Sequence, residues 1–463
     1  MRWPDILRVT LFSLLLAPTA AISQDYVIRN VTVIDGTGKP AKPSMSVVVI
    51  NRRIAEVVPA SQESRHPGIR VIDGSGRFLI PGLWDAHVHL VDIDEAAIPI
   101  LVTYGVTSVR DMGGDIDRIK DWRRRIANGT LIGPRIEFCG PMLEGDWEQK
   151  PGARKDHWAV TTPEAARATV DKLAAAGVDC IKMRGYKSPE TYFALASEAK
   201  RVGLPLYGHA PWGVDPIAAS DAGQKSFEHA FYPWPWDKLS AEEKERVEDH
   251  FRKNGSLLVP TLIAWQSFLL PGATIDAAVH DTEGKSDPRQ LSVTPALRRN
   301  WISGAADIKK MVRGDQALPG WRKAMEASYA QIQEMHDHGV GVMAGTDTGS
   351  TLVFPGDALH RELGLLVHQC HFTPMEALLT ATIIPAKSLG VEDRLGTVAP
   401  GKMADLVLLH ANPLDDISSL GAIDGVMLDG RWFDESELKQ IVIQSEHKIR
   451  AEYKRDQEFA APR

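Results

Sequence analysis

The sequence predicts an α/β protein: a (β/α)8 TIM-like barrel joined to a small β-sandwich domain that both ends of the chain build. Residues 25–80 read as short strands and turns, and residues 393–434 return to the same pattern. Between them, residues 81–392 alternate strands with helical segments, and about eight strands can be counted, the number found in such a barrel. Residues 435–463 begin as a charged amphipathic helix, which we expect on the surface.

A secretory signal is predicted ahead of these domains, in residues 1–24. Arg2 and Arg8 flank the start of an apolar run that ends in small residues, as in exported proteins. We expect cleavage after Ser23 or Gln24, and a periplasmic or secreted mature protein. A membrane anchor is the alternative, but the run is too short to span a bilayer comfortably. The signal also lacks the cysteine of a lipoprotein, so no membrane association is expected after cleavage.

Composition restricts the class of protein. The chain has 463 residues, 44% of them hydrophobic and 24% charged, which is typical of a soluble globular protein. The net charge of -7 argues against a nucleic-acid partner. Cys139, Cys180 and Cys370 form neither a disulfide framework nor the close pairs of a structural zinc site. One pair is compatible with an oxidising compartment, but we expect buried free thiols.

The first β segment divides into short strands. Residues 26–34 alternate apolar and polar side chains, residues 46–58 read as a hairpin around 51–53, and residues 70–76 give a further strand and turn. None of these stretches gathers catalytic residue types. We therefore expect this domain to have no catalytic role.

The barrel strands follow in order along the chain. Helices are expected between them, two with Thr162 or Ser188 as N-cap and a proline at the first helical position. The long interval before the last strand, which contains Trp301 and Trp321, is expected to form a lid or subdomain. After the stretch 81–90, strands are predicted at residues 105–111, 134–140, 178–182, 205–209, 223–229, 256–262 and 339–347.

Two histidines mark the end of the first barrel strand. His87 and His89 are two residues apart, and alternate side chains of a strand share one face. Two imidazoles on one face can form half of a metal site. The alternative is a chance His-x-His pair that is simply solvated.

Further strand ends carry side chains of the same chemistry. They are Lys182, His209, His229 and Asp347. Each has an ordinary structural explanation: a hydrogen-bonded histidine, a surface lysine, or an aspartate that caps the next helix. In a barrel, however, the carboxyl ends of all strands meet at one face. Their joint occurrence in strand order predicts a metal centre.

The motifs around these residues resemble the amidohydrolase superfamily in its binuclear-metal form. They are Pro-Gly-Leu-Trp-Asp-Ala-His-Val-His at 81–89, Gly-Thr-Asp-Thr-Gly at 345–349, Thr-Pro-Met-Glu-Ala-Leu at 373–378 and Leu-Gly-Thr-Val-Ala-Pro-Gly-Lys-Met-Ala-Asp-Leu-Val at 395–407. Within the superfamily, the chain is most similar to the imidazolonepropionase-related and Xaa-Pro dipeptidase-like branch. It departs from the commoner patterns at Gly-His-Ala-Pro, 208–211, and at Gln-Cys-His-Phe, 369–372. Both departures concern substrate rather than metal.

The resemblance implies a role for each strand-end residue. The nitrogen and oxygen ligands suit two divalent ions, with Zn2+ expected first. Such ions activate a water and polarise the scissile carbonyl, and the aspartate would carry the proton to the leaving nitrogen. If the lysine is not carboxylated, one ion is expected instead of two. The implied ligands are His87, His89 and Asp347 for the more buried ion, His209 and His229 for the second, and carboxylated Lys182 as the bridge.

Four residues are candidates for substrate contact: Arg184, Tyr186, Tyr232 and His360. A guanidinium can bind a substrate carboxylate through two hydrogen bonds, but Arg184 could instead pair with a carboxylate of the protein. Aromatic side chains such as Tyr232 are as often part of the packed core as of a substrate pocket.

These observations predict an exported enzyme that hydrolyses an amide or peptide-like C–N bond of a small molecule, such as a dipeptide or N-acyl amino acid. The alternatives are a lactone, carbamate or phosphotriester hydrolase with the same centre, and a metal-free binding protein of the same fold. The sequence leaves the substrate and the oligomeric state open, a homo-oligomer included.

Overall fold

The computed structural model describes most of the chain. The side chains of residues 457–460 are outside the description. The described residues also exclude the predicted signal up to residue 23 and two candidate substrate contacts, Tyr186 and Tyr232. The described ranges are 24–64, 66–145, 155–185, 188–229, 236–313 and 315–460.

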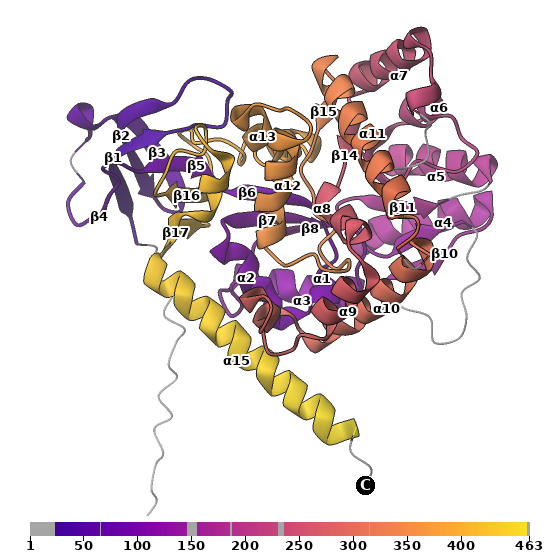
Figure 1. Ribbon diagram of the computed structural model, residues 1–463. Coiled ribbons are helices and arrows are strands. Elements are labelled where there is room, and N and C mark those ends of the chain that lie inside the picture. The colour runs from indigo at the N-terminus through magenta and orange to yellow at the C-terminus, as the bar shows by residue number, and fades with distance from the viewer. Residues whose placement is uncertain are drawn as a thin grey trace, which may run out of the picture.

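Strands from both ends of the chain form one eight-stranded mixed sheet (Figure 1). The junction is the antiparallel pair β5 (Phe78–Pro81) and β16 (Leu406–Leu409), in which Leu79 faces Leu408. The prediction that both ends build one β unit is confirmed, whereas the sandwich arrangement stays a prediction. The order is β18-β17-β16-β5-β1-β2-β3, with β4 beside β1; the bounds are β1 Tyr26–Val33, β2 Lys42–Ile50, β3 Arg53–Pro59, β4 Arg70–Asp73, β17 Ile423–Leu428 and β18 Arg431–Asp434.

The hairpin predicted around residue 51 is present between β2 and β3. Asn51 and Arg52 both have positive φ, 51° and 69°, as two-residue hairpin turns that match the twist of the strands require. Val47, Val49 and Leu408 are buried in the core of this sheet. Alternation in the sequence thus gives the sheet a covered apolar face.

The middle of the chain forms two sheets in which every strand pair is parallel. One sheet has the order β6-β7-β8 and the other β10-β9-β11-β12-β13-β14-β15. Strands β9 and β10 have three residues each and were not expected from the sequence. The bounds are β6 Leu83–Val88, β7 Val106–Asp111, β8 Arg135–Phe138, β9 Met142–Glu144, β10 His157–Ala159, β11 Ile181–Gly185, β12 Leu206–Gly208, β13 Gln224–Glu228, β14 Leu257–Val259 and β15 Gly341–Val342.

Hydrogen bonds also join the two parallel sheets. Ala86 N, in β6, donates to Ala344 O beyond β15 at 3.0 Å. At the other side, Asp179 N donates to Phe138 O at 2.9 Å and so connects β8 with the segment before β11. Both edges of the three-stranded sheet are therefore hydrogen-bonded to segments that follow β15 or precede β11 of the other sheet.

Helices follow most of the parallel strands, as predicted. Thr162 and Ser188 cap α4 (Pro163–Ala176) and α5 (Pro189–Val202) with their side chains, and a left-handed glycine ends each helix. The other helices around these sheets are α1 Leu90–Ile93, α2 Ile98–Thr103, α3 Ile116–Ala127, α6 Pro216–Asp221, α7 Ala241–Asn254, α12 Asp357–His368, α13 Pro374–Thr380 and α14 Ile383–Ser388.

The interval between β14 and β15 is helical. It contains α8 (Leu262–Trp265), α9 (Gly272–His280), α10 (Pro295–Met311) and α11 (Leu318–Asp337). Across the described residues, no single helix has the length and apolar character needed to cross a membrane; only the bent pair formed by 262–269 and α9 meets those criteria jointly. The role of this insertion as a lid stays a prediction.

The C-terminal helix α15 (Glu435–Ala460) runs beside the small sheet and the helices of the larger part (Figure 1). Leu438, Ile441 and Ile449 are buried, and the helix packs against α2 and α10. It is therefore a packed element with one solvated face.

One expectation about the cysteines is wrong. Cys139 and Cys180 form a disulfide, while Cys370 is a buried free thiol, as expected. The backbone hydrogen bond between Asp179 and Phe138 places the two half-cystines side by side. Their separation of 41 residues gives no signal for this pairing in the sequence.

Candidate metal centre

Five of the six predicted ligands lie in or after the carboxyl-terminal parts of parallel strands. His87 is in β6 and His89 follows it; His209 and His229 directly follow β12 and β13. Asp347 comes after β15, and Lys182 is the second residue of β11 rather than the last residue of its strand. The strands themselves bring these residues to one region, where such folds place their active sites.

His87, His89 and Asp347 form the tightest group. One candidate ligand atom from each lies within 4.8 Å of the others. Asp347 Oδ1 is 3.1 Å from His89 Nε2 and 3.4 Å from His87 Nε2. Two imidazoles and a carboxylate at this spacing can share one cation.

The two remaining histidines adjoin this group. The ring centroid of His229 lies 4.9 Å from that of His87 and 4.7 Å from that of His209. Burial, together with nearby positive charge from Lys182, lowers the pKa of His209 well below its usual value. A neutral imidazole is the form that binds a metal.

Lys182 completes the set from β11. Its side chain is buried, and burial lowers the pKa of its ammonium group to about 8. Its charge acts on His87, His209 and His229, so the amine belongs to the same cluster.

The unsatisfied atoms of the cluster fit a metal. Within the described residues, His87 Nε2, His89 Nδ1 and Lys182 Nζ are buried without a hydrogen-bond partner. Buried polar atoms normally have partners, so orphaned ones at a functional site require an explanation. Nitrogen and oxygen donors without thiolate suit zinc and similar divalent ions. The donor set is therefore compatible with the metal that the superfamily implies.

Three residues at the ends of successive strands have left-handed backbones. The φ angles are 70° at His229, 48° at Thr261 and 57° at Asp347. This conformation is unfavourable for residues with a side chain, above all for β-branched Thr261. Thr261 Oγ1 lies 2.7 Å from His229 Nδ1. Strained backbone that the surroundings enforce is concentrated at functional sites, and here it belongs to two candidate ligands and a residue that contacts one.

Asp85 links the first strand to the segment that contains Asp347. Its Oδ1 accepts from Thr346 N at 3.0 Å, and its Oδ2 accepts from Thr346 Oγ1 at 2.6 Å. Burial raises the pKa of Asp85 to about 7, although these hydrogen bonds oppose the rise. The contact holds Asp347 next to β6 and was not anticipated from the sequence.

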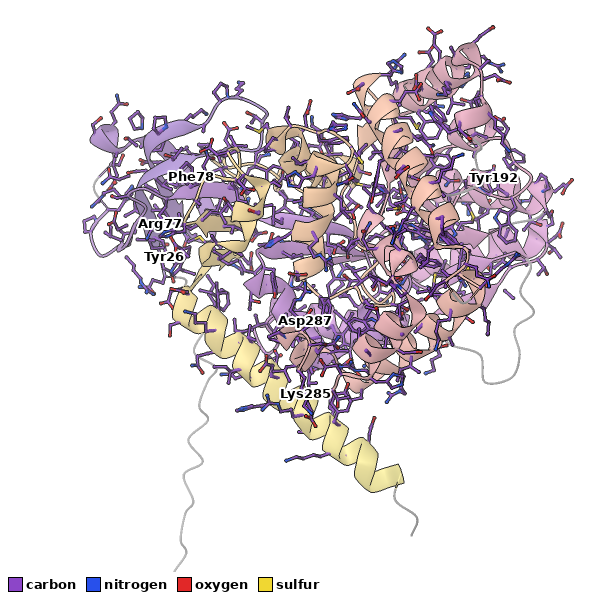
Figure 2. The ribbon with its side chains drawn as sticks, in the orientation of Figure 1. Tyr26, Arg77, Phe78, Tyr192, Lys285 and Asp287 are labelled. Atoms are coloured by element: carbon purple, nitrogen blue, oxygen red, sulfur yellow. A yellow bond between two sulfur atoms is a disulfide. The ribbon has the colours of Figure 1, made fainter. Side chains whose placement is uncertain are left out.

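Behind His209, a hydrogen-bonded pair holds the end of β12. Tyr192 OH, in α5, donates to Gln224 Oε1 at 3.0 Å; Figure 2 labels this tyrosine on the side of the molecule away from the small sheet. Gln224 Nε2 lies 3.1 Å from Gly208 O and 3.0 Å from His209 O. The backbone that presents His209 is thereby held in place.

A buried pair, Glu228 and Arg110, lies against His87 and was also missed. A signal was available: both residues are in predicted barrel strands, parallel strands of this kind are generally buried, and a buried charge needs a partner.

The substrate-contact candidates are placed differently. Arg184 Nη1 donates to Glu144 Oε1 at 2.7 Å, so the alternative of a carboxylate of the protein is realised, although the Arg184 side chain remains 47% exposed. His360 is in α12, where its Nε2 lies 2.8 Å from Tyr104 O. Contact with substrate stays a prediction for both.

Aromatic side chains of the insertion border the cluster. The Trp265 ring lies edge-on to His229, with 6.3 Å between centroids. Phe268 and Trp321 adjoin Trp265 at 5.1 and 6.4 Å. The insertion thus brings an apolar surface beside one candidate ligand.

Comparison with known proteins finds a family model and several relatives that this chain resembles. The Amidohydrolase family model matches residues 297–433. An imidazolonepropionase from Deinococcus deserti is 36% identical over 126 residues, 26% of this chain and 31% of that protein. An adenine deaminase from Paracoccus denitrificans is 41% identical over 418 residues, 86% of this chain and 57% of that protein. The chain thus spans less than two thirds of either relative.

A solved structure has the same architecture over most of the chain. A candidate prolidase from Bifidobacterium longum superimposes with a TM-score of 0.68 and is 26% identical, over 91% of this chain and 99% of that one. These matches agree with the resemblance of the motifs to the amidohydrolase superfamily.

Proposed function

We propose that this protein is a metal-dependent hydrolase that cleaves an amide or peptide-like C–N bond in a small molecule, such as a dipeptide or an N-acyl amino acid. The observation that carries the proposal is the convergence of four histidines and an aspartate from the ends of parallel strands with a buried lysine of β11. The names of the relatives, an imidazolonepropionase and an adenine deaminase, support action on C–N bonds, as does the prolidase-like solved structure.

The proposed centre holds two divalent ions, with Zn2+ as the expected metal. The unpartnered buried nitrogens support this occupancy. Metals bound there would make a water nucleophilic near neutral pH and polarise the scissile carbonyl. In the proposal, His87, His89 and Asp347 bind one ion, His209 and His229 bind the other, and carboxylated Lys182 bridges them.

Lys182 is proposed to bear a carbamate. Its neutral amine would add carbon dioxide at Nζ and release a proton, which converts a poor ligand into an anionic one. The buried Nζ, which lacks a hydrogen-bond partner among the described residues, supports this assignment.

Asp347 is the proposed proton carrier. Ser350 Oγ donates to Asp347 Oδ2 at 2.7 Å, while Oδ1 faces the two histidines. The carboxylate would accept the proton of the attacking water and deliver it to the leaving nitrogen.

The substrate is proposed to present a carboxylate and an apolar group. Arg184 is half-exposed and its charge acts on Lys182 and His209, which supports contact with an anionic substrate. Trp265, beside His229, supports an apolar side chain on the same substrate. Tyr186 and Tyr232 remain proposed contacts, and His360 a proposed residue of the surroundings.

We further propose that the eight strands β6–β8 and β11–β15 close into a (β/α)8 barrel and that the protein is exported. The hydrogen bonds at both edges of the three-stranded sheet support closure. The disulfide Cys139–Cys180 supports an oxidising compartment.

A substrate screen tests the proposed reaction. The zinc-loaded protein is assayed with dipeptides, N-acyl amino acids, lactones and phosphotriesters. We expect hydrolysis of amide substrates that is lost on chelation and restored by zinc. Turnover confined to lactones or phosphotriesters would overturn the C–N assignment, and a protein that retains no divalent metal would overturn the enzyme assignment as a whole.

A further inference from the structure

A buried ion pair lies directly beneath His87. Glu228 and Arg110 are each 1% exposed. Arg110 Nη2 donates to Glu228 Oε1 at 2.9 Å and to Oε2 at 3.1 Å. The pair is therefore fully desolvated, and its hydrogen bonds determine what else each group can do.

Each oxygen of Glu228 has a second donor. Ser226 Oγ donates to Oε1, and His87 Nδ1 lies 2.7 Å from Oε2. An ionised carboxylate only accepts hydrogen bonds. His87 must therefore present an N–H at Nδ1, because a lone pair there would face the carboxylate.

This contact defines the tautomer of His87. With the proton on Nδ1, the neutral ring has its lone pair on Nε2. Nε2 is the atom that faces Asp347 Oδ1, at 3.4 Å, and it has no hydrogen-bond partner among the described residues. A carboxylate on the far nitrogen of a ligand histidine orients the ring and makes it a better donor to metal.

Arg110 connects this histidine to the strands around it. Its Nε donates to Ala86 O, the residue before His87, at 2.6 Å, and its Nη1 donates to Ser226 Oγ at 3.1 Å. Its guanidinium also stacks on Tyr207, two residues before His209, with 4.3 Å to the ring centroid. One side chain thus contacts β6, β12 and β13.

A contribution to folding stability does not by itself explain this ion pair. Desolvation of two buried charges offsets much of their attraction, and apolar replacements of similar volume are often neutral for stability. A role at the metal centre accounts better for the pair, because Glu228 Oε2 also faces His87 Nδ1.

We propose that Glu228, held by Arg110, is a positioning residue that fixes His87 in the tautomer that binds metal through Nε2. The inference rests on the metal centre of the proposed function. It adds a residue that acts through His87, not one that touches the substrate.

The test measures binding of Zn2+ alone, by competition with a chromogenic chelator, in the full chain. Glu228→Gln keeps the shape of the side chain but has one acceptor oxygen instead of two. Its amide NH2 must therefore point either at His87 Nδ1 or at the donors of Arg110 and Ser226. The paired variant Arg110→Met/Glu228→Met removes both charges together. We expect zinc affinity to fall about 10- to 100-fold in both.

A matched control is available in the small sheet. Glu63 also accepts from an arginine and a serine, Arg29 and Ser46, but it lies in the small β domain. Glu63→Gln should leave zinc affinity unchanged. Thermal denaturation of the metal-free proteins should give the paired variant a Tm near that of the wild type, and its Co2+ complex should show an altered visible absorption spectrum.

Wild-type zinc affinity and an unchanged Co2+ spectrum in the paired variant would overturn the proposed role. If the paired variant does not fold, the zinc affinity and the Co2+ spectrum of Glu228→Gln decide whether the proposed role holds. Failure of the wild type itself to bind zinc would instead defeat the proposed function, and the inference with it.

Discussion

The two halves of the candidate metal centre differ in what their side chains need before they can bind a metal. In the first half, His87 contacts Glu228, and Asp347 is held by Ser350. In the second half, Lys182 is buried with an Nζ that lacks a hydrogen-bond partner among the described residues. Histidine and aspartate side chains of the first half can bind a metal without modification, whereas Lys182 in the second half needs an added group to become an anionic ligand. We infer that one ion can bind to the chain as it folds, and that the second depends on modification of Lys182.

The largest expected effect comes from the first half. Asp347→Asn should lower kcat about 10²- to 10⁴-fold, because an amide cannot accept the proton that the carboxylate moves. The measurement is steady-state hydrolysis of the best substrate, with circular dichroism to verify folding. Asp73→Asn, in the small sheet, serves as the control. Retained turnover in Asp347→Asn would refute the assignment of the proton carrier.

In the second half, Lys182→Ala should reduce bound zinc from two equivalents to one and lower kcat at least about 100-fold, because the bridging ligand is lost. Formate or acetate should restore part of both by taking the place of the carbamate. Elemental analysis and kinetics measure the two effects. Lys172→Ala, an exposed lysine in α4, should change neither. Two full equivalents in Lys182→Ala would exclude the bridge.

The smallest effect on the centre is expected from the disulfide, which ends two residues before Lys182. Cys139→Ser/Cys180→Ser opens a loop of 41 residues, which in the chain-entropy estimate lowers the free energy of unfolding by about 4 kcal/mol. Zinc stoichiometry should stay at the wild-type value, since neither cysteine is a ligand. Denaturation with and without reductant measures the effect. Reductant should destabilise the wild type but not the variant; equal sensitivity would contradict the account.

The order of strands and the six candidate ligands could be predicted because local rules suffice for them. Strand alternation places His87 and His89 on one face, and parallel strands bring their carboxyl ends together. Caps such as Thr162 and Ser188 are local as well. The sharing of one sheet by both ends of the chain followed from the return of a strand pattern after the parallel strands, whereas the particular pair at the junction, β5 with β16, was not predicted.

Features that depend on contacts between distant segments could not be predicted in the same way. Cys139 and Cys180 meet because β8 and β11 approach each other, and Arg184 meets Glu144, 40 residues earlier, across adjacent strands. Strands as short as β9 have too few residues to show a period. Glu228 was missed for another reason. Its strand was predicted, and a buried carboxylate needs a partner, but Arg110 was not identified as that partner.

Metal analysis of the purified wild-type protein tests the central claim most directly. Elemental analysis after removal of loosely bound ions should give two equivalents of divalent metal per chain, predominantly zinc. Mass spectrometry of the intact protein under native conditions should show a mass that is higher by one carbon dioxide, the group added to Lys182. A protein without stoichiometric divalent metal, fully folded and with no added carbon dioxide, would contradict the account.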